Sequence, residues 1–170
     1  MPVLHSAKPV ALVILALGVN DLKGRFALTP SDIANGCRLL INDIQTSGTM
    51  CPTSVYCTGL SGLEGVDTTD TTNKAPKILV IAPPPITNDT VFPDFSNNNS
   101  IERSKQLIVE LKKVCSVNDL NVEFMDASEI DGCEASTVDG IHLTVKAHAV
   151  LGSAVADRVR SLLTATSTSP

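Results

Sequence analysis

The stretch "ALVILAL", residues 11–17, decides the fold class of this chain. It is an uninterrupted run of aliphatic residues, and it is too short to span a membrane, which takes roughly 20 apolar residues. A short continuous apolar run is typical of a parallel strand that is covered on both faces. The run "KILVIA", residues 77–82, has the same character and ends at the prolines of residues 83–85. We therefore expect two buried parallel strands.

Between these two runs, the segment "TPSDIANGCRLLINDIQTSG", residues 29–48, has the pattern of an amphipathic helix. Thr29 suits the N-cap, Pro30 the first helical position and Asp32 the first turn, while Gly48 is a suitable stop. The apolar residues at helical spacing are Ile33, Cys37, Leu40, Ile41 and Ile44. This pattern predicts a helix packed on the sheet.

The second half of the chain repeats the alternation of helix and strand. We expect a helix near residues 101–117, a strand at 121–127 and a last helix at 145–163. Alternating strands and helices imply parallel pairing with right-handed crossovers, hence a layered α/β sheet. The apolar line expected for the last helix is Val145, Ala149, Val155, Val159 and Leu162.

Length and composition favour one domain. The chain has 170 residues, of which 43% are hydrophobic, enough to bury a core. We expect a domain over residues 1–163, with a polar insertion at about 49–76 and a flexible tail at 164–170. The net charge of -5 and the absence of a Lys/Arg run argue against a nucleic-acid partner. No segment is long enough for a membrane span.

The five cysteines are an odd number and include no CxxC pair. They indicate neither a disulfide framework nor a zinc site. The apolar run after Lys8 has some features of a signal peptide, but it fits a buried strand better. A cytoplasmic location is therefore favoured over secretion, although the sequence leaves the compartment open.

The motif "DGIH", residues 139–142, places an aspartate three residues before a histidine. At this spacing the carboxylate of Asp139 can bind one ring nitrogen of His142 and leave the other free as a base. The alternative is structural, because an Asp-Gly turn before a helix is common. In the same way, Asn20 of "GVND", residues 18–21, is either an oxyanion donor or a polar loop residue.

Together these stretches resemble the SGNH (GDSL-type) hydrolase family, in its arylesterase and acyltransferase branch. The matching blocks are "VILALGVNDLKGRF", "TPSDIANG", "ILVIAPPPI" and "DGIHLT", in the family's order. The resemblance implies a flavodoxin-like three-layer α/β/α fold and ester or acyl hydrolysis through a serine, without a cofactor. Carried over by position, Asp139 and His142 are catalytic, Asn20 and Gly18 belong to the oxyanion and substrate-binding loop, and Asp21 supports that loop. The expected partner is a small ester or acyl substrate.

The family's nucleophile is expected upstream of the "GVND" strand, where this chain has only "MPVLHSAKPV", residues 1–10. That segment contains no Gly-Asp-Ser block, and Ser6 has the wrong neighbours. We therefore expect a fragment that lacks its nucleophile and its first strands and has negligible esterase activity. The alternative is a catalytically inactive flavodoxin-like interaction module, whose open sheet edge is covered by a partner or by homo-oligomerisation.

Two other site chemistries deserve comparison with the serine mechanism. Cys133 precedes Asp139 closely enough for a Cys–His pair, but a small loop residue is the simpler interpretation. His148 adds a third side chain to Asp139 and His142, yet no further strong ligand is spaced to complete a metal site. We expect no metal, and a solvent-facing or capped core role for His148.

Overall fold

Three parallel strands form the sheet at the centre of the molecule, in the order β1-β2-β3. They are β1 (Leu12–Leu15), β2 (Lys77–Ala82) and β3 (Val122–Asp126). All three lie within the expected runs, and both pairings are parallel, which confirms the α/β class. The register places Leu12 opposite Lys77, and Ile78 opposite Val122.

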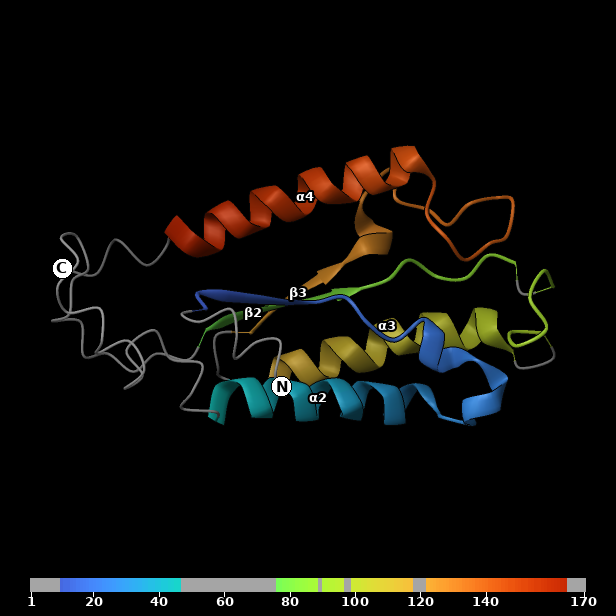
Figure 1. The fold of residues 1–170 in the computed structure, drawn as a ribbon, viewed down its shortest axis with the longest axis horizontal. Helices are drawn as coiled ribbons and strands as arrows, with labels where there is room; N and C mark the ends of the chain where they lie inside the picture. Colours follow the sequence, from blue (N-terminus) through green and yellow to red (C-terminus); the bar gives the residue numbers. More distant parts are fainter. Residues whose placement is uncertain (1–9, 47–75, 89, 97–98, 118–121, 165–170) are drawn as a thin grey trace, which may run out of the picture.

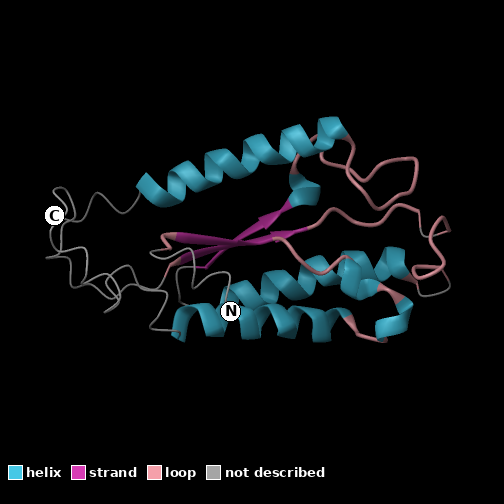
Figure 2. Cartoon of the chain, viewed as in Figure 1, coloured by secondary structure: helices cyan, strands magenta, loops and turns pink. Residues whose placement is uncertain are grey.

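Helices cover both faces of this sheet. In Figure 1, α2 (Pro30–Thr46) and α3 (Ser100–Val117) lie side by side below it, and α4 (Val145–Thr164) lies above it. Figure 2 shows the same three layers, helix over strand over helices. The expected flavodoxin-like arrangement is thereby confirmed.

This computed structural model describes residues 10–46, 76–88, 90–96, 99–117 and 122–164. Ser6, Gly48, nearly all of the expected insertion at 49–76 and residues 165–170 of the expected tail lie outside the described residues. In the described part of the chain, no helix combines the length and the apolar character needed to cross a membrane.

The N-terminus of α2 is held by the predicted cap. The backbone N–H of Asp32 donates to Oγ1 of Thr29 at 3.1 Å, and the backbone N–H of Thr29 donates to Oδ2 of Asp32 at 2.9 Å. This reciprocal pair is a capping box with an aspartate in place of the usual Glu or Gln. The hydroxyl of Thr29 also donates to the same carboxylate, and this hydrogen bond lowers the pKa of Asp32. Substituting such a cap by Ala typically costs about 1 kcal/mol.

Two apolar clusters lie on the two faces of the sheet. The cluster toward α2 and α3 includes Ile41 and Leu107, whose side chains are fully buried. The cluster beneath α4 is built mainly on β2 and β3 and includes the fully buried Leu79. Full burial of one such side chain stabilises the fold by roughly 1.5–3 kcal/mol. The two clusters together hold the helices against the strands whose carboxyl ends carry the candidate site.

The expectation that both apolar runs are covered on both faces is correct for β2 and wrong for the 11–17 run. In that run, Ile14 is 42% exposed and Leu17, just after β1, is 55% exposed. The reason is topological, because β1 is an edge strand of the sheet that the structure describes. An apolar edge of this kind invites further strand pairing.

The line predicted for the last helix is also partly wrong. Val145 is 90% exposed and Ala149 is exposed, so neither packs on the sheet. The rotation of a helix about its axis depends on the surface beneath it, which a single apolar periodicity does not define. The residues of α4 that face the sheet are Ala147, Val150, Leu151, Ala154, Val155, Val159 and Leu162.

Candidate active site

Asp139 and His142 lie together in the loop between β3 and α4. Oδ1 of Asp139 accepts the backbone N–H groups of Ile141 and His142, each at 2.9 Å. Its other oxygen, Oδ2, lies 2.7 Å from Nδ1 of His142. The carboxylate therefore shapes the turn and orients the imidazole at the same time, so the structural and the catalytic interpretations of this motif are compatible.

These hydrogen bonds favour the ionised form of the Asp139 carboxylate. The backbone N–H of Ile141, then the imidazole and backbone of His142, lower the pKa of Asp139 to about 2. Its side chain is 17% exposed, whereas that of His142 is 70% exposed. An ionised carboxylate beside Nδ1 favours the tautomer with the proton on Nδ1, which leaves the lone pair on Nε2. Nε2 is thus suited to accept a proton.

Asn20 begins the 3₁₀ turn η1 (Asn20–Leu22), which follows β1. Gly18 adopts a φ of 115°, and a Cβ there would lie 3.0 Å from Cδ2 of Leu107. The backbone N–H of Asp21 donates to the Gly18 carbonyl at 3.2 Å. Within the described residues, neither the Asn20 amide nor the Asp21 carboxylate has a side-chain hydrogen-bond partner. The Asn20 amide is therefore available to a ligand.

Arg103, on α3, is a residue of this region that sequence reasoning missed. Its guanidinium donates to the carbonyl of Leu22 at 3.2 Å and also to the carbonyl of Leu28. These bonds tie α3 to the segment that follows Asn20. Charge-assisted hydrogen bonds to backbone carbonyls are stronger than neutral ones, so they help to hold this loop. No local pattern in the sequence indicates such a contact.

One cavity of about 480 Å³ brings the two predicted motifs together. Its lining includes Gly18, Asn20 and Asp21 of the first motif, His142 of the second, and His148 of α4. No Ser, Thr or Cys is among the described residues that line it. A base and an amide donor thus share a cavity that lacks a described nucleophile. The apolar part of the lining is Ala16, Leu17, Val19, Ile81, Pro83, Pro84, Ala127, Ile141, Leu143 and Leu151.

The loop after β2 packs closely against the "DGIH" turn. Gly140 is buried with a φ of 70°, and a Cβ there would lie 2.1 Å from the backbone nitrogen of Asn88. The backbone N–H of Thr87 donates to the Gly140 carbonyl at 2.8 Å. Only glycine allows this close approach of two backbones. The Asp-Gly dipeptide was predicted as a turn, but its partner loop was not.

The structure argues against Cys133 as a nucleophile. Its side chain is 1% exposed within the cluster beneath α4, and burial raises the pKa of its thiol. A raised pKa leaves little thiolate, the reactive form. His148 is exposed on α4 rather than in the core, and it lines the same cavity as His142. Among the described residues, no group of three or more His, Cys, Asp or Glu side chains could hold a metal.

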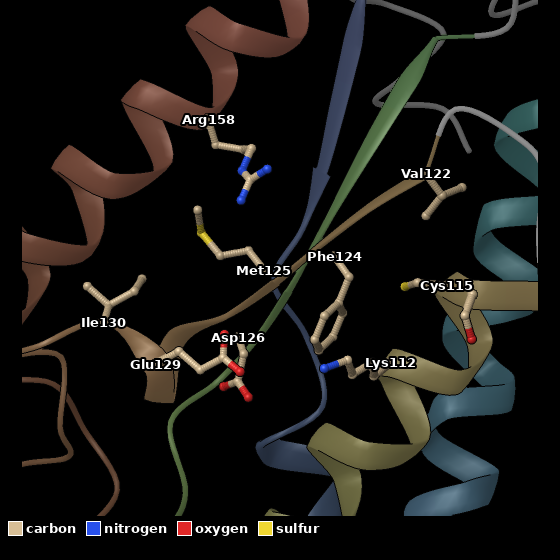
Figure 3. Close-up of a pocket in the computed structure, with 10 residues that line it drawn as sticks. Lys112, Cys115, Val122, Phe124, Met125, Asp126, Glu129, Ile130 and Arg158 are labelled. Carbon is tan, nitrogen blue, oxygen red and sulfur yellow. The ribbon is translucent and has the colours of Figure 1, made fainter.

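A second hollow, of about 510 Å³, lies at the outer edge of β3 and lacks the predicted motifs. In Figure 3, Lys112 reaches into it from α3 and Arg158 from α4, beside Asp126 and Glu129. The guanidinium of Arg158 pairs with the Glu123 carboxylate at 3.3 Å. This mixed-charge surface contains no base oriented by a carboxylate. The cavity that His142 and Asn20 share, by contrast, holds an imidazole that a carboxylate orients.

The family follows from the sequence as a whole. Residues 3–155 match the profile of the GDSL-like lipase/acylhydrolase family. The chain belongs to this family. The SGNH (GDSL-type) resemblance, first suggested by "GVND" and "DGIHLT", is confirmed. No curated protein sequence gives a match to this chain.

Solved structures of related esterases share the fold of this GDSL-like chain. The native aryl esterase of M. smegmatis is 31% identical in sequence and superposes with a TM-score of 0.71. The structure of its inhibitor-bound form is also 31% identical and superposes with a TM-score of 0.72. A carbohydrate acetylesterase from Sinorhizobium meliloti is 33% identical, with a TM-score of 0.71. Each match covers 95% of this chain and 65% of the other. The chain thus spans about two thirds of the length of these solved esterases.

Proposed function

We propose that this chain carries three parts of a serine esterase site, with His142 as the base, Asp139 as its partner and Asn20 as an oxyanion donor. The observation that supports this most is the cavity that holds His142 and Asn20, with Nδ1 of His142 bound by Asp139 at 2.7 Å. Gly18 gives the Asn20 loop its shape, and the backbone of Asp21 supports it.

In the proposed mechanism, Nε2 of His142 takes the proton of a serine hydroxyl as its oxygen attacks the ester carbonyl. Asn20 donates a hydrogen bond to the resulting oxyanion, and Asp139 stabilises the imidazolium. The imidazolium then gives its proton to the leaving alcohol as the carbon–oxygen bond breaks. Water, deprotonated by His142, attacks the acyl-serine; as the bond from the acyl carbon to the serine oxygen breaks, the imidazolium returns the proton to that oxygen, and the acid is released.

The serine, in this proposal, comes from a strand that is not part of this chain. Two observations support the idea: the described lining of the cavity has no Ser, Thr or Cys, and β1 is an apolar edge strand of the sheet formed by the described residues. Loss of the nucleophile of a serine hydrolase costs on the order of 10⁶ in turnover. We therefore expect negligible esterase activity from the chain alone.

A chimera tests this proposal. The chain alone should not hydrolyse p-nitrophenyl acetate above background. Fusing the upstream, serine-bearing part of the M. smegmatis aryl esterase to this chain should restore hydrolysis, and His142→Ala should abolish it again. The matched control carries Ala in place of the supplied serine. Ordinary turnover by the chain alone, lost in His142→Ala, would show that the nucleophile lies within this chain.

The alternative proposal is a non-catalytic interaction module that keeps the family fold. The observation that favours it is the place of β1 at the edge of the described sheet, because self-association would cover Ile14 and Leu17. It predicts a stable homo-oligomer that does not react with fluorophosphonate probes. A folded chimera that remains inactive would favour this module over the enzyme.

A further inference from the structure

A separate cavity of about 380 Å³ adjoins the one that His142 and Asn20 share. The two have Leu17, Gly18 and Asp21 in common, but neither His142 nor Asn20 lines this one. We call it the α2 cavity, because half of the residues that line it belong to that helix. Its volume is enough for a small ligand. The apolar part of its lining is Leu17, Leu28, Ile33, Cys37, Leu40 and Leu111.

A glycine leaves space in the wall that α2 gives to this cavity. Asp32, Gly36 and Leu40 all line it, and since they are four residues apart they follow one another along one face of the helix. A Cβ at Gly36 would meet nothing within 4 Å. Alanine at this position would make a more stable helix, because glycine is unfavourable in a helix interior. The space beside Gly36 is therefore a feature that the stability of α2 does not explain.

The charged groups that line the α2 cavity all have the same sign. They are Asp21 and Asp32, and no Lys, Arg or His is among the described residues of the lining. Thr29 donates two hydrogen bonds to Oδ2 of Asp32, which lower the pKa of this carboxyl and keep it ionised. Oδ1 of Asp32 has no partner in the part of the chain that the structure describes. Burial raises the pKa of the Cys37 thiol, so that side chain stays uncharged.

We propose that the α2 cavity binds a small organic ammonium ion, with its apolar body against the leucine side chains and its charge toward the carboxylates of Asp21 and Asp32. An ammonium group donates hydrogen bonds to carboxylates, and an alkyl chain is removed from water by the apolar wall. A neutral alcohol of the same length gains only the apolar contacts. An organic carboxylate is repelled by the two like charges. The ligand class is therefore a primary amine with a short apolar chain.

Titration of the full chain with hexylammonium chloride tests this proposal, with 1-hexanol and hexanoate as comparison ligands of the same chain length. Ligand-observed NMR should show saturable binding of hexylammonium in the millimolar range, weaker binding of hexanol and no binding of hexanoate. The ¹H–¹⁵N signal of Gly36 should shift in the same titration. Gly36→Leu, whose side chain would fill the space, should abolish binding.

A second glycine provides the matched control for that variant. Gly152 lies on α4, also has nothing within 4 Å of an added Cβ and does not line the α2 cavity. Gly152→Leu should therefore leave hexylammonium binding unchanged. Loss of binding in both leucine variants would show that the effect of Gly36→Leu does not come from filling the cavity.

The contribution of charge is tested at Asp21. Asp21→Asn should weaken hexylammonium binding about 2- to 5-fold, the range for an ion pair near the surface, and leave hexanol binding unchanged. A merely structural role of Asp21 would weaken both ligands equally. Asp43→Asn removes an exposed carboxylate of α2 that does not line the cavity, and it should have no effect.

Four results would overturn the assignment. They are no binding of hexylammonium, equal binding of hexanol or hexanoate, binding that Gly36→Leu leaves intact, and binding that Asp21→Asn leaves intact. The titration uses the chain alone and involves no ester, so its outcome is independent of whether the chimera hydrolyses esters. The ammonium site therefore stands or falls separately from the proposed esterase function.

Discussion

Oδ2 of Asp139 lies 2.7 Å from Nδ1 of His142, while Oδ1 of the same carboxylate accepts the backbone N–H groups of Ile141 and His142. One side chain thus builds the turn with one oxygen and orients the imidazole with the other. Because the two tasks fall on different oxygens, different substitutions should separate them.

Replacing Asp139 by Asn or by Ala should distinguish these tasks. Asn keeps an oxygen for the two backbone N–H groups but offers an NH₂ group to the ring, which favours the wrong tautomer of His142. We expect Asp139→Asn to lower kcat of the active chimera by on the order of 10⁴-fold. Its melting temperature should fall less than that of Asp139→Ala, which loses both oxygens. An equal decrease in melting temperature in the two variants would show that the turn does not depend on Oδ1.

The low pKa of Asp139 predicts how stability depends on pH. Its pKa of about 2 in the folded chain lies below the ordinary value of 3.8, so the unfolded chain binds the proton more tightly. The stabilisation is therefore fully present above about pH 4 and is lost as the pH falls toward 2. Denaturant unfolding should show that the stability gap between the wild type and Asp139→Ala narrows over this range. A gap that stays constant from pH 6 to pH 2 would refute the assignment.

Substitution by Ala at Gly140 and at Gly36 should change the free energy of unfolding in opposite directions. At Gly140, a φ of 70° and the backbone of Asn88 both exclude a Cβ, so we expect Gly140→Ala to cost more than about 2 kcal/mol. At Gly36, on α2, nothing lies within 4 Å of the added Cβ. There, Ala should stabilise the chain by about 0.5–1 kcal/mol through its higher helix propensity. Chemical denaturation measures both changes, and a neutral Gly140→Ala would mean that the two loops do not pack as described.

In the sheet that the structure describes, β1 is an apolar edge strand, which predicts self-association that a charge should suppress. Ile14→Lys places a charge on the exposed face of the edge strand, where it opposes pairing with another chain. We expect light scattering to give a lower average molecular mass for Ile14→Lys than for the wild type, and the circular dichroism spectra of the two to be the same. Leu39→Lys, on the outer face of α2, is the matched control and should leave the mass unchanged. If both variants associate like the wild type, the β1 edge is not the surface of contact.

Several features could be predicted from the sequence because they depend on neighbouring residues. The strands follow from short apolar runs, the start of α2 from Thr29 and Asp32, and the pairing of Asp139 with His142 from their spacing. In each case the interacting groups are a few residues apart, so the local backbone conformation largely sets their distance. The resemblance to the SGNH family extended this to Asn20 and His142, because both motifs carry over by position to one site.

Only the tertiary structure decided which side chains surround those groups. Gly140 against Asn88, Phe92 against His142 and Arg103 against the carbonyl of Leu22 all join segments that are distant in the chain. The rotation of α4 and the exposure of Ile14 likewise depend on which surfaces lie opposite them. The sequence by itself determined the elements and the paired residues of the motifs, because those rest on local geometry. The packing around the motifs was decided by the folded chain, because contacts between distant segments have no local pattern.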